Sequence, residues 1–542
     1  MTEQYLVTFT VGPVQSFIAS ARKVEDFWSG SYILSHLVRE ALRIFFDKEQ
    51  EMNLELVFPV VKKRDIIEPN LEELHIASLP NRITAIVTGD EAEVVSLLRN
   101  VEKHVRSEFY NIAYAAIDRV FADATAQEQN ALQQQTTAQL DNLLEMYWVA
   151  QPLNKAEFSD TRLQLERRLG ALKNEKQFGQ IDEHGLTCSV CKSKEALTIE
   201  RVEAAHSYKE MKEQLASTWA KRTKAYQGKR IKDNEFLCGV CLMKRHARDY
   251  FKEHFNVKMA QGFKRFDAIA DIVDEDEGYY AILMLDGDNM GQHLTGNDVT
   301  TYQDVSKKLA KFAGRKVPEI VEKNNKGVLV YAGGDDVLAF MPVPEALQIA
   351  QQLRFAFSDE QGGLGKNATA SAGLVVAHVK APLQLLLDEV RKLEKKAKAY
   401  PNKNALAIGV HTRSGEISET VLPWTTSTQH ATVDLLQRVI TLLKEDVSTT
   451  FIHRFTEAFL PLLDAEQYKK VPKYLVETEL RRLMKRARKT DLRDEQLEDV
   501  LQQLITLHEE QNSTKDFIYL LKIMRFFERK DGVNGDVTAT TN

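Results

Sequence analysis

Two adjacent aspartates beside two glycines form the part of this sequence whose residue types are best suited to hold a metal ion. Asp335 and Asp336 follow Gly333 and Gly334 in the segment GVLVYAGGDDVLAF, residues 327–340. The apolar runs on either side predict the strands of a β-hairpin, and glycine permits the positive φ of its turn. Two carboxylates at such a tip repel each other, so either one is protonated or a cation lies between them. The alternative is an acidic surface turn without chemistry, because short motifs recur by chance.

A second acidic turn occurs upstream and favours the metal interpretation. The apolar run Tyr280–Leu285 predicts a buried strand that ends at Asp286 and Asp288 of a DGD sequence. If this strand lies beside the hairpin, Asp286 faces Asp335 and Asp336 and completes the carboxylate set that Mg²⁺ takes together with substrate phosphates. Two such ions, about 3.5–4 Å apart, activate an attacking hydroxyl and stabilise a leaving phosphate.

The elements that must position these aspartates follow one another along the chain. Thr369–Val376, which contains Ser371, predicts a strand, Leu383–Ala399 an amphipathic helix with a lysine-rich end, and Ala405–Val410 a last strand. The order strand, acidic turn, helix, hairpin, helix, strand is that of a ferredoxin-like palm, as in nucleotidyl cyclases and polymerases.

Several of these motifs together resemble known enzymes. The GGDD hairpin, the DGD turn, the SAG strand and the segment AKAYPNKN, residues 397–404, are similar to the palm of GGDEF-type cyclases. Combined with Val11–Leu37 (VGPVQSFIASARKVEDFWSGSYILSHL) and two CxxC pairs, they resemble the large palm-polymerase subunit of type III-B CRISPR effector complexes. The resemblance runs from the N-terminus to about Arg413.

The resemblance implies a nucleotidyltransferase that uses ATP, with Mg²⁺ or Mn²⁺ on Asp286, Asp335 and Asp336. Its implied product is a cyclic oligoadenylate second messenger, made when the guide-RNA complex binds foreign target RNA, and its implied partners are the guide crRNA, the target RNA and the other subunits. In the catalytic palm, the residues implied to contact the nucleotide are Gly333, Gly334, Asp288, Ser371, Lys398 and Lys403. The first 90 residues resemble a degenerate palm, whose implied contacts with the acceptor nucleotide are Ser16, Arg22, Trp28 and Ser31. The alternatives there are a core aromatic at Trp28 and a solvated helix residue at Arg22.

Three rival functions remain open on the sequence. Some members of the resembled family that lack a nuclease domain join AMP to S-adenosylmethionine with the same palm. A cyclase of the c-di-GMP type usually carries one palm and no zinc unit. A scaffold subunit with an inactive palm is the non-enzymatic reading, and an intact GGDD paired with DGD argues against it.

The four cysteines of the chain all lie in CxxC pairs and predict a structural zinc site. Cys188, Cys191, Cys238 and Cys241 supply four soft ligands, the set that tetrahedral structural Zn²⁺ takes. A redox role needs only one reactive pair, and neither pair has a thioredoxin-like context. Between the pairs, Lys209–Lys232 is basic with interleaved aromatic residues, which suits either contact with RNA or a partner, or a solvated helix.

Length, charge and apolar patterning bound the remaining possibilities. The chain has 542 residues and a formal net charge of −6, so contact with RNA must be local or made by partners. No apolar run approaches the ~20 residues of a membrane span, which predicts a soluble, cytoplasmic protein without a membrane partner. We expect an α+β multidomain chain with two ferredoxin-like palms, a zinc-binding helical insertion and an all-α C-terminal domain. The expected domains are a first degenerate palm at 1–90, a helical region with the four-cysteine zinc site at 91–265, the catalytic palm at 266–415, a helical domain at 416–530 and a flexible tail at 531–542.

Finer expectations concern individual segments of the chain. Residues 27–31 (FWSGS) predict a break between two helices, and residues 91–172 predict helices throughout. The acidic run 271–277 reads as a solvated linker, and Arg481–Lys489 as a surface for RNA or a partner. The first strand begins within ten residues of Met1 and the dipeptide His-Asp does not occur, so we expect no HD-type DNase.

Overall fold

The computed structural model divides the chain into two compact units. It describes residues 3–67, 76–154, 157–175, 183–200, 206–226, 230–254, 278–293, 298–463, 470–489 and 493–531. The first unit comprises Met1–Ala268, Gly291–Gly314 and Val330–Gly334, and the second comprises Ile269–Met290, Arg315–Leu329 and Asp335–Asn542. The acidic run at 271–277 and the expected tail from 532 onwards lie outside the described residues.

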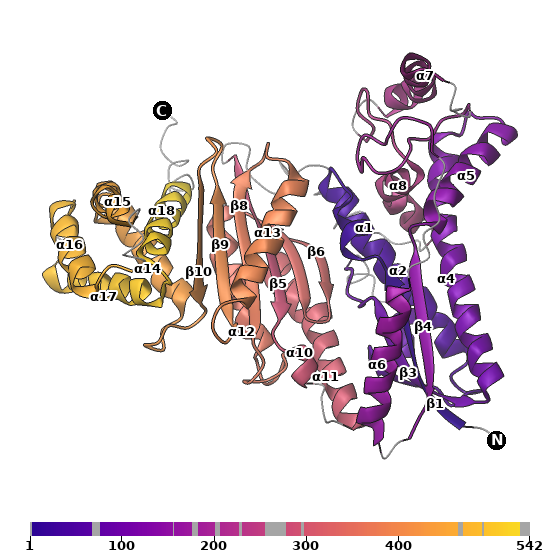
Figure 1. The fold of residues 1–542 in the computed structure, drawn as a ribbon, viewed down its shortest axis with the longest axis horizontal. Helices are drawn as coiled ribbons and strands as arrows, with labels where there is room; N and C mark the ends of the chain where they lie inside the picture. The colour runs from indigo at the N-terminus through magenta and orange to yellow at the C-terminus, as the bar shows by residue number, and fades with distance from the viewer. Residues whose placement is uncertain are drawn as a thin grey trace, which may run out of the picture. The chain divides into compact units, whose positions relative to one another are not determined.

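The first unit is built on a four-stranded antiparallel sheet (Figure 1). Its strands are β1 Glu3–Gly12, β2 Glu55–Phe58, β3 Arg82–Gly89 and β4 Glu145–Pro152, in the order β2-β3-β1-β4. Numbered along the chain, this is the strand order of a ferredoxin-like sheet, as the first palm requires. β4 corrects the expectation that 91–172 is helical throughout, because the fourth strand of the sheet comes from within that segment.

Long helices cover this sheet. They are α2 Val24–Asp47, α4 Glu91–Val120 and α6 Phe158–Asn174, whereas α5 Ala126–Asp141 packs against α4. α2 runs without interruption through FWSGS, which corrects the expected break. A Cβ on Gly30 would lie 3.2 Å from both Ile18 Cα and Lys244 Cε, so glycine is used there for close packing within a continuous helix.

A second, six-stranded sheet has the order β10-β9-β8-β5-β7-β6; its strands belong to the second unit except for most of β6, which is grouped with the first. The strands are β5 Tyr279–Gly287, β6 Val328–Gly333, β7 Asp336–Met341, β8 Ala370–His378, β9 Ala405–His411 and β10 Ile417–Pro423. β5 pairs antiparallel with β7 and β8, which again gives the ferredoxin-like order, while β9 extends the sheet parallel to β8. The sequence analysis did not predict β10.

Two helices lie directly on this sheet, α12 Val343–Phe357 and α13 Leu383–Lys398. Figure 1 shows α13 lying across the strands. A Cβ on Gly373 would lie 2.5 Å from Val390 O of α13, so the glycine of the SAG strand is what allows the helix to pack this close.

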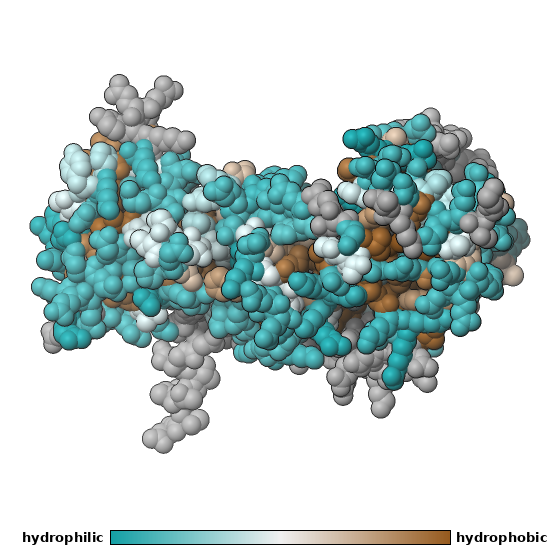
Figure 2. All heavy atoms as spheres, turned by 90° about the horizontal axis from the view of Figure 1, so that it is seen from below, coloured by the Kyte–Doolittle hydropathy of each residue, from teal (hydrophilic) through white to brown (hydrophobic). Residues whose placement is uncertain are grey.

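Five helices follow the sheet: α14 Thr432–Glu445, α15 Thr450–Leu463, α16 Lys473–Arg486, α17 Asp494–Glu510 and α18 Thr514–Asp531. α18 packs against β10 and α14. All five helices belong to the second compact unit. Within the described ranges, no helix is both long and apolar enough to cross a membrane. Hydrophilic residues predominate on the face drawn in Figure 2.

Candidate active site and cysteine cluster

Asp335 and Asp336 lie at the tip of the β6–β7 hairpin, as the sequence predicts. Gly334 has φ +71°, a value open to glycine, and the turn it makes places Asp335 against the end of β5. A Cβ on Gly287 would lie 2.9 Å from Asp335 Cβ and 3.0 Å from Asp335 Oδ2. The middle glycine of the DGD sequence therefore makes room for the GGDD tip.

The hairpin carboxylates are held in an unfavourable electrostatic environment. Asp335 is half-buried and Asp336 is exposed at its surface, but the protein packed around both limits their hydration. Burial raises the pKa of Asp335 to about 6. Burial, and then the charges of Asp335 and Glu394, raise the pKa of Asp336 to about 7. A bound cation relieves this kind of repulsion, so the donor set fits a divalent metal.

Asp286, at the end of β5, is paired with a lysine. Its Oδ2 contacts Lys398 Nζ at the C-terminal end of α13, and Lys398 Nζ is also 3.3 Å from Glu394 Oε1. Across the described ranges, Asp286, Asp335 and Asp336 do not present three ligand atoms that all lie within 4.8 Å of one another. A metal ion shared by the three carboxylates therefore requires Lys398 to leave Asp286, and the phosphate contact expected of Lys398 stays a prediction.

Asp288 has a different environment from Asp286. It is only 1% exposed; its Oδ1 accepts a hydrogen bond from Ser371 Oγ (2.9 Å), and its Oδ2 accepts from Thr369 Oγ1 (2.9 Å) and the Asn404 amide (3.0 Å). Asp288 and Ser371, both predicted to contact the nucleotide, are hydrogen-bonded to each other, and their contact with a nucleotide stays a prediction. Their hydrogen bonds fasten the end of β5 to the start of β8 and to the loop before β9.

That loop carries Lys403 in an uncommon backbone conformation. Asn402, Lys403 and Asn404 have φ values of 63°, 57° and 51°, a region that asparagine tolerates better than lysine. Lys403 Nζ donates to Asn289 Oδ1 (2.7 Å), which is itself in the left-handed region at φ 54°. The hydrogen bond from the Asn404 backbone amide to Asp288 Oδ2 holds this turn in place. The carboxylate of the DGD turn therefore shapes the loop.

Three residues of this network were missed by sequence reasoning: Thr369, Arg354 and Glu394. Arg354 of α12 is 6% exposed and donates from Nε to Asn404 Oδ1 (2.6 Å), and burial lowers its pKa to about 10. Burial raises the pKa of Glu394, which faces Lys398 one helical turn away on α13. The sequence signals were the one basic residue of α12 and a carboxylate four residues before Lys398.

The four residues expected to contact an acceptor nucleotide divide into two kinds within the first unit. Trp28 is 5% exposed and stacks on Tyr32 with ring centroids 4.7 Å apart, and Ser31 is 1% exposed and donates to Phe27 O (3.3 Å). These two side chains are packed in the interior. Ser16 and Arg22 are exposed, and their role stays a prediction.

The four cysteines converge as predicted. Their sulfur atoms all lie within 4.8 Å of one another, and Cys191 Sγ is 3.7 Å from Cys238 Sγ. In each CxxC loop a backbone amide donates to the first sulfur, at 3.4 Å for Cys188 and for Cys238. Burial raises the pKa of Cys238, whereas a bound cation favours the thiolate. A closed set of four thiol groups, three of them buried and Cys191 partly so, fits structural zinc.

The helix that begins at the second CxxC pair, α8 Gly239–His254, connects the cysteines to the segment before α2. Lys244 is 1% exposed and donates from Nζ to the carbonyls of Phe17 (2.7 Å) and Ser20 (2.5 Å). Arg245 is fully buried and contacts Asp26 (2.5 Å) and Glu235 (3.2 Å). The helix that carries Cys241 is thus bonded through Lys244 and Arg245 to the region of the predicted acceptor residues.

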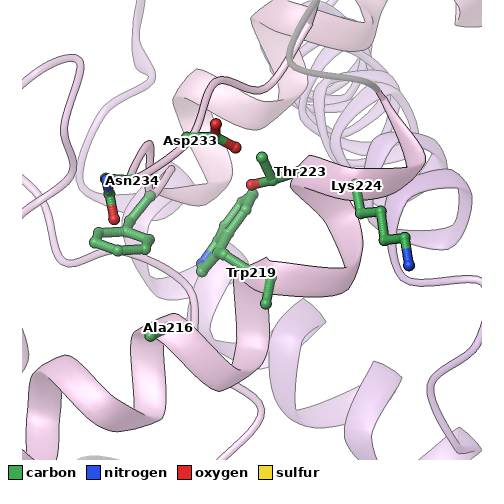
Figure 3. Close-up of a pocket in the computed structure, with 8 residues that line it drawn as sticks. Ala216, Trp219, Thr223, Lys224, Asp233 and Asn234 are labelled. Carbon is green, nitrogen blue, oxygen red and sulfur yellow. The ribbon is translucent and has the colours of Figure 1, made fainter.

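The two basic segments offer less free charge than their composition indicates. In α7, Tyr208–Ala225, Trp219 is 1% exposed and donates from Nε1 to Leu197 O (2.9 Å), and Arg222 pairs with Asp123. An open pocket of about 720 Å³ lies beside Trp219 (Figure 3). The residues that line it are Ala216, Trp219, Ala220, Thr223, Lys224, Asp233, Asn234 and Phe236.

In the C-terminal basic stretch, Arg481 pairs with Glu477 and Glu498. Arg482 and Arg488 pair with Glu479 and Asp494. These intramolecular pairs offset part of the positive charge, and a surface for RNA or a partner stays a prediction.

A ferredoxin-like sheet with two carboxylates at its hairpin tip, beside an aspartate at the end of the central strand, defines a palm domain of the cyclase and polymerase type. Residues 279–407 match the family described as Cas10/Cmr2, second palm domain, and residues 6–114 match CRISPR-associated protein Cmr2, N-terminal. Both matched regions are those of Cas10/Cmr2 proteins, and they support a Cas10/Cmr2 subunit.

Individual relatives agree with this assignment. "CRISPR system Cmr subunit Cmr2" of Pyrococcus furiosus is 25% identical to this chain over 551 residues. The aligned region covers 77% of this chain and 63% of that protein, so the chain spans less than two thirds of this relative's length. The structure of the type III-B Cmr-beta complex bound to cognate target RNA contains a chain with a TM-score of 0.64 at 14% identity, covering 97% of this chain and 83% of that one. The crystal structure of Csm1 in T. onnurineus has a TM-score of 0.52 at 13% identity, and the match covers 97% of this chain and 70% of that one. At these identities the structural likeness concerns the fold.

Proposed function

We propose that this chain is the nucleotidyltransferase subunit of a type III-B CRISPR effector complex and that it converts ATP into a cyclic oligoadenylate when target RNA binds. The observation that carries the proposal is the position of Asp335, against Gly287 at the end of the strand that carries Asp286, within a region matched to the Cas10/Cmr2 second palm. The guide crRNA, the target RNA and the other subunits of the complex are the partners this function requires.

Each charged group of the palm has a part in this chemistry. Mg²⁺ or Mn²⁺ on Asp286, Asp335 and Asp336 would supply the charge neutralisation that phosphoryl transfer needs. Lys398 exchanges its contact with Asp286 for one with the triphosphate, and Lys403 extends from the loop that Asp288 fixes. Phosphoryl transfer depends mainly on placement and electrostatics, so a network that fixes these groups suits the task.

The acceptor side of the reaction rests on the first unit. Its ferredoxin-like sheet supports a second, degenerate palm, and its exposed Ser16 and Arg22 are the residues we assign to an acceptor nucleotide. The acceptor's 3′-hydroxyl attacks the α-phosphate of ATP, and pyrophosphate leaves.

Mass spectrometry of products tests the proposal. The purified effector complex is given target RNA, ATP, S-adenosylmethionine and Mg²⁺ or Mn²⁺, and a parallel sample lacks target RNA. We expect cyclic oligoadenylates only when target RNA is present. A conjugate of AMP with S-adenosylmethionine would show that the acceptor is S-adenosylmethionine and not a second nucleotide. The absence of any nucleotide product would favour the scaffold function. The lack of HD-type DNase activity stays a prediction, contradicted by metal-dependent DNA cleavage that survives loss of Asp335 and Asp336.

A further inference from the structure

Three side chains form a further group that could bind a metal, apart from the palm carboxylates and the four cysteines. Glu389 lies on α13, His411 ends β9 and Glu419 lies on β10; one ligand atom from each lies within 4.8 Å of the others. All three are partly buried, with 15–25% of each side chain exposed. The group therefore combines a position on regular secondary structure with access from solvent.

The register of the β9–β10 hairpin explains why these residues meet. Ile417 pairs with His411 and Glu419 pairs with Gly409, so His411 and Glu419 lie diagonally on the same face of the sheet. Gly409 presents no side chain between them: a Cβ there would lie 3.5 Å from Glu419 Cγ and 2.9 Å from Leu393 of α13. The Glu419 side chain can therefore lie across β9, beneath the helix that carries Glu389.

The hydrogen bonding of the group leaves one ligand atom unused. His411 Nε2 is buried without a hydrogen-bond partner among the described residues, and it faces Glu419 Oε1 at 4.0 Å. The opposite oxygen, Glu419 Oε2, contacts Lys396, and Glu389 Oε1 is 2.6 Å from Lys392 Nζ. The lysines thus orient the carboxylates while Glu419 keeps an oxygen toward the imidazole, the arrangement in which outer partners fix metal ligands.

The geometry points to a site for a divalent first-row transition ion of the Zn²⁺ class, bound by His411, Glu389 and Glu419. One imidazole and two carboxylates form a common ligand set for such ions, whereas Mg²⁺ and Ca²⁺ prefer oxygen alone. Two ligands of a tetrahedral zinc lie about 3.4 Å apart, so the 4.0 Å between His411 and Glu419 closes with a small side-chain adjustment.

The ion would join α13 to the β9–β10 hairpin. α13 carries Glu394 and Lys398 to the palm carboxylates, so the site braces the helix that presents these groups. Lys392 and Lys396 offset the charge of the two carboxylates, and we therefore expect weaker binding than at the four cysteines. This difference in affinity makes the two sites separable by dialysis.

Zinc binding to the full chain tests the inference. Protein is dialysed until only tightly held zinc remains, then titrated with Zn²⁺ in excess Mg²⁺, which occupies oxygen-only sites. Metal is counted by mass spectrometry and binding is followed by calorimetry. We expect one further equivalent in the wild type, lost or weakened at least about tenfold in His411→Gln and Glu419→Gln. Glu416→Gln is the matched control, because Glu416 lies in the same hairpin but pairs with Lys522.

A second readout distinguishes this site from the cysteines. Co²⁺ in the further equivalent should give ligand-field absorption without a thiolate charge-transfer band. Circular dichroism establishes that each variant is folded. No further equivalent in the wild type would overturn the inference. So would an equivalent that His411→Gln and Glu419→Gln both retain, or one that Asp335→Asn with Asp336→Asn removes.

Discussion

Lys398 Nζ contacts the Asp286 carboxylate. The negative charge that β5 brings to the palm site is therefore paired with the ammonium at the C-terminal end of α13. Burial, and then the charge of Lys403, lower the pKa of Lys398. If Asp286 is a metal ligand, as we propose, the lysine and the metal ion compete for the same carboxylate. In the proposed mechanism, Lys398 exchanges this carboxylate for the triphosphate when nucleotide and metal bind.

Lys398→Met should separate metal binding from catalysis. Without the ammonium, Asp286 is free, and Mn²⁺ binding to the nucleotide-free protein should tighten by about 3- to 10-fold, while nucleotide synthesis falls. Electron paramagnetic resonance measures free Mn²⁺, and product formation is measured on the same preparation. Lys395→Met, which removes an exposed lysine of the same helix, should change neither quantity. Weaker Mn²⁺ binding in Lys398→Met would contradict the competition.

Replacing both hairpin aspartates should abolish synthesis and leave the fold intact. Asp335→Ala with Asp336→Ala removes the carboxylates that hold the metal, and activity should fall by at least about 100-fold. Circular dichroism and thermal melting should show a folded protein. Asp388→Asn removes an exposed carboxylate on α13 and serves as the control. Full activity in the double variant would refute the site.

The same two residues predict an unusual pH dependence of stability. Both pKa values are raised, from 3.8 to about 6 and about 7, so the folded protein holds extra protons between about pH 4 and pH 7. Its free energy of unfolding must then fall as pH rises through that window. In chelator at pH 8, Asp335→Asn with Asp336→Asn should be more stable than wild type by roughly 1–2 kcal/mol, after allowing for the solvent around Asp336.

Urea unfolding at pH 4 and pH 8 checks this sign. The gain should vanish at pH 4, where the wild-type carboxylates are largely protonated in the folded state. A gain that is larger at pH 4 than at pH 8 would show that the raised pKa values are not the cause.

Loss of one zinc ligand should lower bound zinc and stability together. Metal binding at four thiolates is part of the folding free energy, so Cys188→Ser or Cys238→Ser should lose zinc in elemental analysis and melt at a lower temperature. Ser217→Ala, an exposed change on α7, should do neither. Wild-type protein without zinc would refute the assignment.

Arg245→Met tests the link between the cysteine region and the first turn of α2. It leaves Asp26 and Glu235 buried without their cation, and removing one partner of a buried pair costs about 3–5 kcal/mol. Adding Asp26→Asn should recover part of the loss, measured by urea unfolding. Lys252→Met, at an exposed position of α8, is the control. No destabilisation in Arg245→Met would contradict the buried network.

Local pattern was enough to predict the catalytic sheet. The strands at 279–287, 328–333, 336–341, 370–378 and 405–411 follow from apolar runs bounded by glycine and aspartate, and the cysteine cluster follows from its spacing. β10 was missed because ISETVLP alternates weakly and its pairing with β9 is set by a turn. The break expected at FWSGS was wrong because the helix is stabilised by packing against Lys244, which is distant in sequence.

The roles of the site residues were harder to predict than their positions. Asp286 and Asp288 are two residues apart, yet one is paired with Lys398 and the other is enclosed by hydroxyl and amide donors. Which carboxylate is free to bind a metal depends on β8 and the loop before β9, and no local pattern contains that information.

The late position of β4 has a consequence for biosynthesis. β1 occupies an interior place in the first sheet, but its pairing partner Glu145–Pro152 is made more than a hundred residues after it. Until the ribosome has released that segment, one edge of β1 remains an unpaired template for another chain. Such long-range pairing is slow to form, so the nascent N-terminal half passes through an aggregation-prone interval that ends only when β4 docks.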